Sequence, residues 1–190
     1  MSSAGKDEPA TNPAAGQQFS DIEAIKQLKA RYCRHLDAKD WQTWREVFID
    51  DFVSDTTESG GPVIIGADAF VEFLRTQLGK PGRRTVHHVH APEIELVAPV
   101  AARGIWAMQD VVRLAPGLTL LGYGHYHETY AKIDGRWYIA TSKLTRLRED
   151  LVTPVFSFRL PAWLRDAAGA AVKRKAHRHR HGPPRRCHRC

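Results

Sequence analysis

The sequence predicts an α+β fold in which helices come first and a curved antiparallel sheet follows. Apolar residues recur at helical spacing within the first 80 residues. The stretch that follows is rich in Val, Ile, Tyr and Trp and is divided by turn residues, which indicates long consecutive strands. Strands of about 12 residues twist and curl. We therefore expect the helices to close one mouth of the sheet and to leave a pocket on its concave side.

The first helix is expected over residues 21–38, where apolar side chains repeat at roughly helical spacing. Ser20 and Glu23 stand three residues apart just before the apolar run, which is the pattern of a capping box. Asp40 can cap a short second helix that begins near Trp41.

Two short strands around a Gly-Gly-Pro turn are expected in residues 52–65, and a third helix in residues 67–78, where Gly79 and Pro81 end it. Asp134 and Gly135 then separate two strand patterns, which is a strong hairpin signal. The long strands of the predicted meander are residues 84–97, 103–114, 118–133 and 136–148. The sequence thus predicts one domain over residues 20–150.

The ends of the chain differ in composition from this domain. Residues 1–19 are expected to be a disordered leader without a secretory signal, and residues 151–172 an extension with a short helix. Residues 173–190 hold eight Lys and Arg and no acid, and without them 20 basic and 21 acidic residues remain. The net charge of +7 therefore comes from a basic His/Arg-rich disordered tail, and no specific nucleic-acid partner is expected for the domain.

Cysteine use and hydropathy indicate a cytoplasmic protein. Cys33, Cys187 and Cys190 form no disulfide framework, and no apolar run approaches the length of a membrane span. The Cys-x-x-Cys of the tail lacks the second half of a structural zinc site. No metal is therefore expected to be bound.

Three histidines lie close together at the start of the first long strand. Side chains alternate along a strand, so His88 and His90 share one face and His87 takes the other. All three cannot enter one cavity unless a bulge intervenes, which makes three-histidine metal binding from this stretch unexpected. Periodicity alone leaves open which of the two sets points inward.

Asp37 lies at the carboxyl end of the first predicted helix, where the helix dipole disfavours a carboxylate. One interpretation is a solvent-exposed acid near the cap of the next helix. The other is a buried acid that faces a histidine of the sheet, because a buried acid needs a partner. An Asp–His pair of this kind is a common general base.

The third long strand carries a second polar row. Tyr123, His125 and His127 fall on one face, and Gly122 and Gly124 fall on the other. The row is either a polar pocket wall or a wet outer face. We prefer the pocket wall, because glycines on the opposite face suggest close packing there.

Three further charged residues of the strands are candidates. Asp110 shares a face with Trp106 and Met108, and is either exposed at a strand end or paired in the cavity. Lys143 and Arg146 of the last strand usually face solvent as residue types, but one of them near the mouth could hold an anionic leaving group or a substrate carboxylate.

Residues 20–150 resemble the SnoaL-like branch of the nuclear transport factor 2 (NTF2)-like superfamily. This branch includes scytalone dehydratase, bile-acid 7α-dehydratase and hexachlorocyclohexane dehydrochlorinase. The segments that carry the resemblance are YCRHLDAKDW (32–41), TVHHVHAPEIEL (85–96), ARGIWAMQD (102–110) and GYGHYHETYAKIDGRWYIATSKLTRLR (122–148). Leu36 stands where scytalone dehydratase has a tyrosine, so activity on scytalone itself is not expected.

The resemblance implies a cone, in which a curved and mostly antiparallel sheet wraps around three helices and encloses an apolar pocket that needs no cofactor. It implies that Asp37 and His87 form the catalytic dyad, that Tyr32 matches a tyrosine of bile-acid dehydratase, and that Asp110 matches an acid of its middle strand. Lys143, and after it Arg146, is the position of a cation that helps the leaving group. A homodimer or homotrimer is also implied.

Our first hypothesis is a dehydratase that acts on a hydroxylated, carbonyl-activated steroid-like or polyketide-like molecule. In it His87 is the base, Tyr32 or the protonated His87 is the acid, and Asp110, His125 and His127 position polar groups of a small apolar substrate. The alternatives are an isomerase or cyclase that uses the same dyad, and a non-catalytic module for ligand binding or dimerisation.

Overall fold

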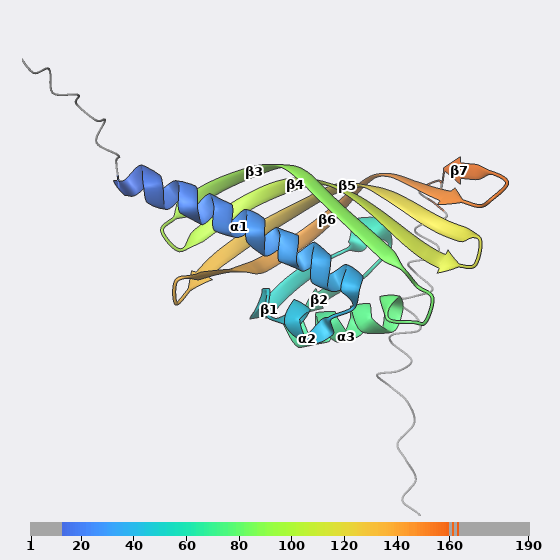
Figure 1. Ribbon diagram of the computed structural model, residues 1–190, viewed down its shortest axis with the longest axis horizontal. Coiled ribbons are helices and arrows are strands. Elements are labelled where there is room, and N and C mark those ends of the chain that lie inside the picture. The colour runs from blue at the N-terminus through green and yellow to red at the C-terminus, as the bar shows by residue number, and fades with distance from the viewer. Residues whose placement is uncertain (1–12, 160, 162, 164–190) are drawn as a thin grey trace, which may run out of the picture.

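The computed structural model describes residues 13–159, 161 and 163, and its described part has the α+β architecture that the sequence predicts (Figure 1). The helices are α1 (Pro13–Ala38), α2 (Trp41–Arg45), the 3-10 helix η1 (Thr57–Ser59) and α3 (Ala67–Leu78). The strands are β1 (Phe48–Asp55), β2 (Val63–Ile65), β3 (Thr85–Ala98), β4 (Ala101–Ala115), β5 (Leu118–Ile133), β6 (Arg136–Val152) and β7 (Ser157–Arg159).

The described strands form one sheet in the order β2-β1-β6-β5-β4-β3, and β7 pairs with the end of β6. The long strands pair antiparallel, whereas β1 lies parallel to β6. Figure 1 shows α1 along one face of the sheet, with α2 and α3 beside β1 and β2. The helices therefore cover one face of the sheet and leave the other face uncovered in the described chain.

Bulges curve the sheet around the helices. The register shifts between His90 and Glu93 of β3, where Ala91 has a φ of 45°. It shifts again between Tyr123 and Gly124 of β5, opposite β6. A bulge adds an unpaired residue to one strand, which bends the strand and increases its twist. The long strands thus wrap around α1 instead of forming a flat sheet.

An aromatic cluster joins the short helices to the sheet. Phe48 and Phe52 of β1 have ring centroids 4.4 Å apart, and Phe70 of α3 packs on Phe52 at 5.1 Å. Trp44 of α2 is fully buried and packs on Phe48 at 5.0 Å. Buried aromatic side chains remove large apolar areas from water, so this cluster sets the position of α2 and α3 at the mouth of the sheet.

A fully buried ion pair joins α1 to the middle of the sheet. Lys29 Nζ lies 2.6 Å from Glu128 Oε1, and both side chains are inaccessible to solvent. Glu128 also accepts hydrogen bonds from Ser142 at 3.1 Å and from Tyr130 at 2.7 Å. A buried charge needs partners of this kind, so the pair orients α1 against β5 and β6.

The first helix begins earlier than the sequence predicts. It starts at Pro13 instead of residue 21, so residues 13–19 are helical and Ser20 lies inside the helix. Proline is favoured in the first turn of a helix, and the Ala and Gln residues that follow are good helix formers. Our expectation for residues 1–12 lies outside the described residues.

The last part of the domain also differs from expectation. β6 continues to Val152, and Ser157–Arg159 forms strand β7 within the extension expected over residues 151–172. The short helix expected in that extension falls mostly outside the described residues, and Trp163 is helical. Residues 164–190, including the tail and its two cysteines, lie outside the described residues. Within the described part of the chain, no helix is both long enough and apolar enough to span a membrane.

Candidate active site

A cavity of about 210 Å³ lies on the concave side of the sheet, between α1, α3 and the strands. Its apolar wall comes mainly from α1 and α3, whereas the polar groups come mainly from the sheet. The apolar wall includes Leu36, Phe70, Phe73, Leu74, Leu78, Val112 and Leu144, and the polar groups include Tyr32, Ser54, Ser59, His87, Asp110, Tyr126, Ser142 and Arg146. The cavity thus has one apolar side and one side that can hydrogen-bond.

The end of α1 and the start of β3 bring Asp37 and His87 together. His87 Nδ1 lies 2.7 Å from Asp37 Oδ1, and the backbone N–H of His87 donates to Asp37 Oδ2 at 2.7 Å. The hydroxyl of Thr85, two residues before His87 and on the same face, donates to Asp37 Oδ1 at 2.8 Å. The Asp37 carboxylate is therefore held by three donors from a single strand.

This arrangement sets which ring nitrogen of His87 carries a proton toward Asp37. Burial disfavours the charge of Asp37, but hydrogen bonds from His87 and Thr85 outweigh that cost and lower the pKa of the carboxyl below its usual value. An ionised carboxylate only accepts hydrogen bonds, so Nδ1 of His87 must carry a proton. In the neutral imidazole, Nε2 then keeps a lone pair that can accept a proton from a ligand in the cavity.

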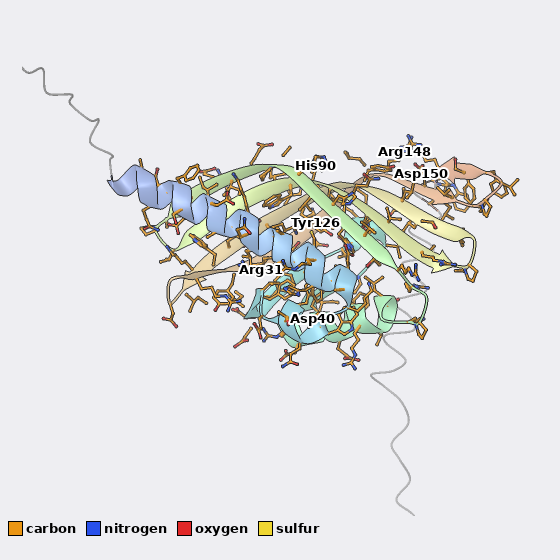
Figure 2. The ribbon with its side chains drawn as sticks, viewed as in Figure 1. Arg31, Asp40, His90, Tyr126, Arg148 and Asp150 are labelled. Carbon is orange, nitrogen blue, oxygen red and sulfur yellow. The ribbon has the colours of Figure 1, made fainter. Side chains whose placement is uncertain are left out.

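The alternation of side chains along β3 places His87 on one face of the strand and His88 and His90 on the other. His87 is buried to 9% exposure and lines the cavity, whereas His88 and His90 are exposed. In Figure 2, His90 lies on the outer side of β3, while Tyr126 lies between α1 and the sheet. The interpretation of Asp37 as a solvent-exposed acid is wrong, because its carboxylate is engaged by Thr85 and His87.

Tyr32 lines the cavity from α1. Its ring packs edge-on against Tyr126 at 6.0 Å, and Lys29 Nζ lies 4.0 Å from its centroid. Burial raises the pKa of Tyr32 well above its usual value, and the neighbouring Tyr126 and Glu128 raise it further. The phenol therefore stays protonated at neutral pH and can donate a hydrogen bond.

Asp110 and Arg146 form a second ion pair in the cavity, with Arg146 Nη2 2.6 Å from Asp110 Oδ2. Arg146 Nε also donates to Ser59 Oγ at 2.9 Å and lies 3.3 Å from Glu149 Oε1. Burial disfavours the guanidinium charge, but Asp110 outweighs this and raises the pKa of Arg146. Among the described residues, Asp110 Oδ1 is buried and has no hydrogen-bond partner.

The structure does not bring His125, His127 or Lys143 into this cavity. They lie on the opposite face of the sheet, where their cross-strand partners on β4 and β6 also point outward. His127 and Lys143 line a separate surface hollow of about 690 Å³ on that face. Lys143 lies 3.4 Å from Glu58 and its side chain is half exposed.

The glycines of β5 explain why these expectations were wrong. A Cβ on Gly122 would overlap Asp110 Oδ1 and the guanidinium of Arg146. The close packing that the glycines indicate is therefore the packing of the buried ion pair inside the cavity. The histidine row, on the opposite face, is the outer one, and Asp110 and Arg146 are among the polar strand residues that line the cavity.

Sequence reasoning missed Lys39, Ser142 and the hydroxyl of Thr85. Lys39 Nζ donates to Thr85 Oγ1 at 2.6 Å, and Ser142 lines the cavity while it donates to Glu128. Ser142 precedes Lys143, so strand alternation could have found it once Lys143 was known to face outward. Lys39 follows a predicted helix end, where nothing in the sequence indicates a contact with β3.

The sequence model of the SnoaL-like domain matches residues 17–143, which is about two thirds of the chain. The chain belongs to the SnoaL-like domain family. The match begins within α1 and ends on β6, so it includes every residue that lines the cavity except Leu144 and Arg146.

Several known proteins to which this SnoaL-like chain is similar in sequence or in fold have names that describe enzymes. "Probable cyclase FGR4" of Gibberella zeae is 25% identical over 135 residues, which cover 65% of this chain and 89% of that protein. The crystal structure of a candidate scytalone dehydratase from Novosphingobium aromaticivorans has a TM-score of 0.65 and 22% identity, and covers 71% of this chain and 89% of that one. The hexachlorocyclohexane dehydrochlorinase LinA-type3 from Novosphingobium barchaimii has a TM-score of 0.63 and 15% identity, and covers 76% and 92%. At these identities the two structures show the fold alone.

Proposed function

We propose that this SnoaL-like protein is a cofactor-independent dehydratase that uses Asp37 and His87 as a general base. The observation that carries the proposal is the 2.7 Å hydrogen bond between Asp37 Oδ1 and His87 Nδ1, which leaves Nε2 of a cavity-lining histidine free to take a proton. An ionised aspartate orients the imidazole and stabilises the imidazolium that forms during such a transfer.

In the proposed reaction, His87 Nε2 removes a proton from the carbon next to a substrate carbonyl, and the C–H electrons form an enolate. The enolate then restores the carbonyl and expels the β-hydroxyl group, which leaves as water after it receives a proton. Tyr32 or the imidazolium of His87 supplies that proton. If Tyr32 supplies it, the tyrosinate regains a proton from His87, so that both groups return to their starting states.

Asp110 and Arg146 are proposed to orient the substrate. Asp110 Oδ1 is buried and unpaired among the described residues, so it can accept a hydrogen bond from a substrate hydroxyl. Arg146, 2.6 Å from the other oxygen of Asp110, places a positive charge where oxygen develops negative charge in an enolate. Of the five residues that the sequence assigned to substrate binding, the proposal keeps Asp110 and Arg146, which line the cavity, and drops His125, His127 and Lys143, which do not.

The size of the cavity favours a compact substrate. Its volume of about 210 Å³ is below the roughly 300–1,000 Å³ of clefts that enclose drug-sized ligands. A polyketide-like compound of one or two rings would be enclosed, whereas a steroid-like compound would leave part of its ring system in the mouth. We therefore propose a hydroxylated ketone with a small ring system.

A cyclase or isomerase is the second candidate, and the 25% identical protein named "Probable cyclase FGR4" favours it. The same base would remove a proton next to a carbonyl, but no leaving group would depart. A binding module without catalysis is the third possibility. A binding module has no need of an Asp–His pair whose aspartate is held by three donors. Removing such a pair from water is unfavourable in free energy.

The test uses β-hydroxy ketones on one-ring and two-ring scaffolds, incubated with the full chain. Water loss is followed by the ultraviolet absorbance of the enone, and exchange of the α-proton in D₂O is followed by NMR. We expect Asp37→Asn and His87→Gln to lose both signals by about 10²-fold or more. His88→Gln is the matched control, because His88 is exposed on the other face of the same strand.

Each outcome has a distinct meaning. Water loss that depends on His87 supports the dehydratase. Proton exchange without water loss, again dependent on His87, favours the isomerase or cyclase. If the ketones bind but neither signal depends on His87, the proposed base is wrong and the domain is a binding module.

A further inference from the structure

Lys39 occupies a backbone position at which lysine is not the favoured residue. It follows the last residue of α1 and has a φ of 61°, in the left-handed region that glycine adopts without strain. The N–H of Lys39 donates to the carbonyl of Leu36 at 3.2 Å, and the N–H of Asp40 donates to that of His35 at 3.0 Å. This is the Schellman pattern of a helix end, where glycine is the usual residue. Helix termination therefore gives no reason for a lysine here.

The side chain of Lys39 has a specific partner. Its Nζ donates to Thr85 Oγ1 at 2.6 Å, and Thr85 is buried to 6% exposure. An ammonium group has only donors, so the Thr85 hydroxyl must accept this bond. The one proton of that hydroxyl is then directed to Asp37 Oδ1, 2.8 Å away. The hydrogen bonds thus run in one direction, from Lys39 through Thr85 to Asp37.

The hydrogen bonds of His87 also point toward Asp37. Asp37 accepts from Thr85 and from both Nδ1 and the backbone N–H of His87. All the donors point toward Asp37, so the carboxylate stays ionised and Nδ1 of His87 keeps its proton. The positive charge of Lys39, at the far end of this chain of hydrogen bonds, opposes the formation of a second positive charge on His87.

We propose that Lys39 is a positioning residue, which acts through Thr85 to hold Asp37 ionised and to keep His87 neutral and able to accept a proton. This inference rests on the proposed function, in which His87 is the base. Lys39 does not line the cavity and is not proposed to touch the substrate. Its role is to set the proton affinity and the tautomer of the histidine that does.

Other charged or titratable groups line the same cavity as His87, and they stay constant in the experiment. They are Tyr32 of α1, Asp110 of β4, Tyr126 of β5 and Arg146 of β6, and Arg146 also lies 3.3 Å from Glu149. Asp110 pairs with His87 across β3 and β4, and its charge is balanced by Arg146. Replacing Lys39 therefore removes one positive charge and leaves these other groups in place.

The experiment is an NMR titration of the histidine rings in the unliganded full chain, with the tautomer read from the ring ¹⁵N shifts. Lys39→Asn removes the charge and tolerates the left-handed backbone, so the fold should be kept. We expect it to raise the pKa of His87 by about 0.5–1 unit. Lys39→Arg should leave that pKa unchanged. Lys26→Met is the charge control, since Lys26 is on the same helix roughly 16 Å from Asp37 along the axis.

Two further variants separate the proposed role from simpler ones. Lys39→Gly relieves the backbone and removes the charge, so it should stabilise the fold and still raise the pKa of His87. A lysine with only a structural role would show the first effect alone. Thr85→Val removes the hydroxyl and keeps the shape, and in this background Lys39→Asn should shift the pKa by less than half as much.

The outcomes distinguish this inference from the proposed function. An unchanged His87 pKa in Lys39→Asn and Lys39→Gly, with a clear fall in Asp37→Asn, overturns the role of Lys39 and leaves the base intact. A full shift in the Thr85→Val background overturns the path through Thr85. If Asp37→Asn itself leaves His87 unchanged, the base is lost and the proposed function fails with it.

Discussion

At the scale of single residues, the site depends on which polar atoms are satisfied by the protein and which are left for a ligand. Both oxygens of Asp37 are occupied by donors from β3, so this residue has no oxygen to spare for the substrate. Asp110 has one oxygen bound to Arg146 and one without a partner among the described residues. The partly exposed carboxylate of Asp37 and the buried one of Asp110 are thus suited to different tasks.

Asp37 should also make stability depend on pH. Its pKa is lowered in the folded state, so its stabilising effect is present above the unfolded pKa of about 3.9 and is lost as the pH falls through the folded value. We expect urea unfolding to show wild type more stable than Asp37→Asn at pH 7, with a smaller difference at pH 3. A difference that is independent of pH would mean that the carboxylate is not held as an anion.

At the scale of elements, β5 has two faces with opposite functions. The outer face carries His125 and His127, and the inner face has Gly122, over which Arg146 and Asp110 lie. A missing side chain on one strand thus makes room for a long charged side chain from its neighbour. The bulge between β5 and β6 adds a residue to β6 at this place, so that Arg146 rather than Leu147 pairs with Gly124.

Gly122→Ala tests this packing. The new Cβ would overlap Asp110 and Arg146, so we expect the free energy of unfolding to fall by about 1–3 kcal/mol. Activity on any substrate of the site should fall as well, because the ion pair is displaced. Gly16→Ala is the control: it lies in α1 with nothing within 4 Å of its Cβ, and should be neutral or stabilise by up to about 1 kcal/mol. Equal effects of the two changes would contradict the packing argument.

At the scale of the whole molecule, α1 is joined to the sheet by buried polar contacts along its length. Asp21 near its start accepts from Lys132 at 2.6 Å and from Trp137 at 2.9 Å. Lys29 in its middle pairs with Glu128, and Asp37 at its end binds Thr85 and His87. Three separate points of attachment set both the position and the rotation of the helix, and hence the place of Tyr32 in the cavity.

Removing the middle attachment should be costly. Lys29→Met leaves Glu128 buried without its counter-ion, and we expect a loss of about 3–5 kcal/mol in the free energy of unfolding. Adding Glu128→Gln to Lys29→Met removes the unpaired charge and should recover part of this loss. Urea unfolding of both single variants and the double variant measures the coupling. If the double variant is as unstable as the sum of the singles, the two charges do not stabilise each other.

The α+β order of elements, the long strands and the alternation that separates His87 from His88 and His90 are predictable from the sequence, because they depend on local periodicity. The tertiary structure is needed to show which face of β5 points inward, and that Arg146 rather than Lys143 reaches Asp110. It also decided that Lys39 meets Thr85, 46 positions away. These contacts depend on bulges and on the packing of α1 across several strands, and no local pattern in one strand contains that information.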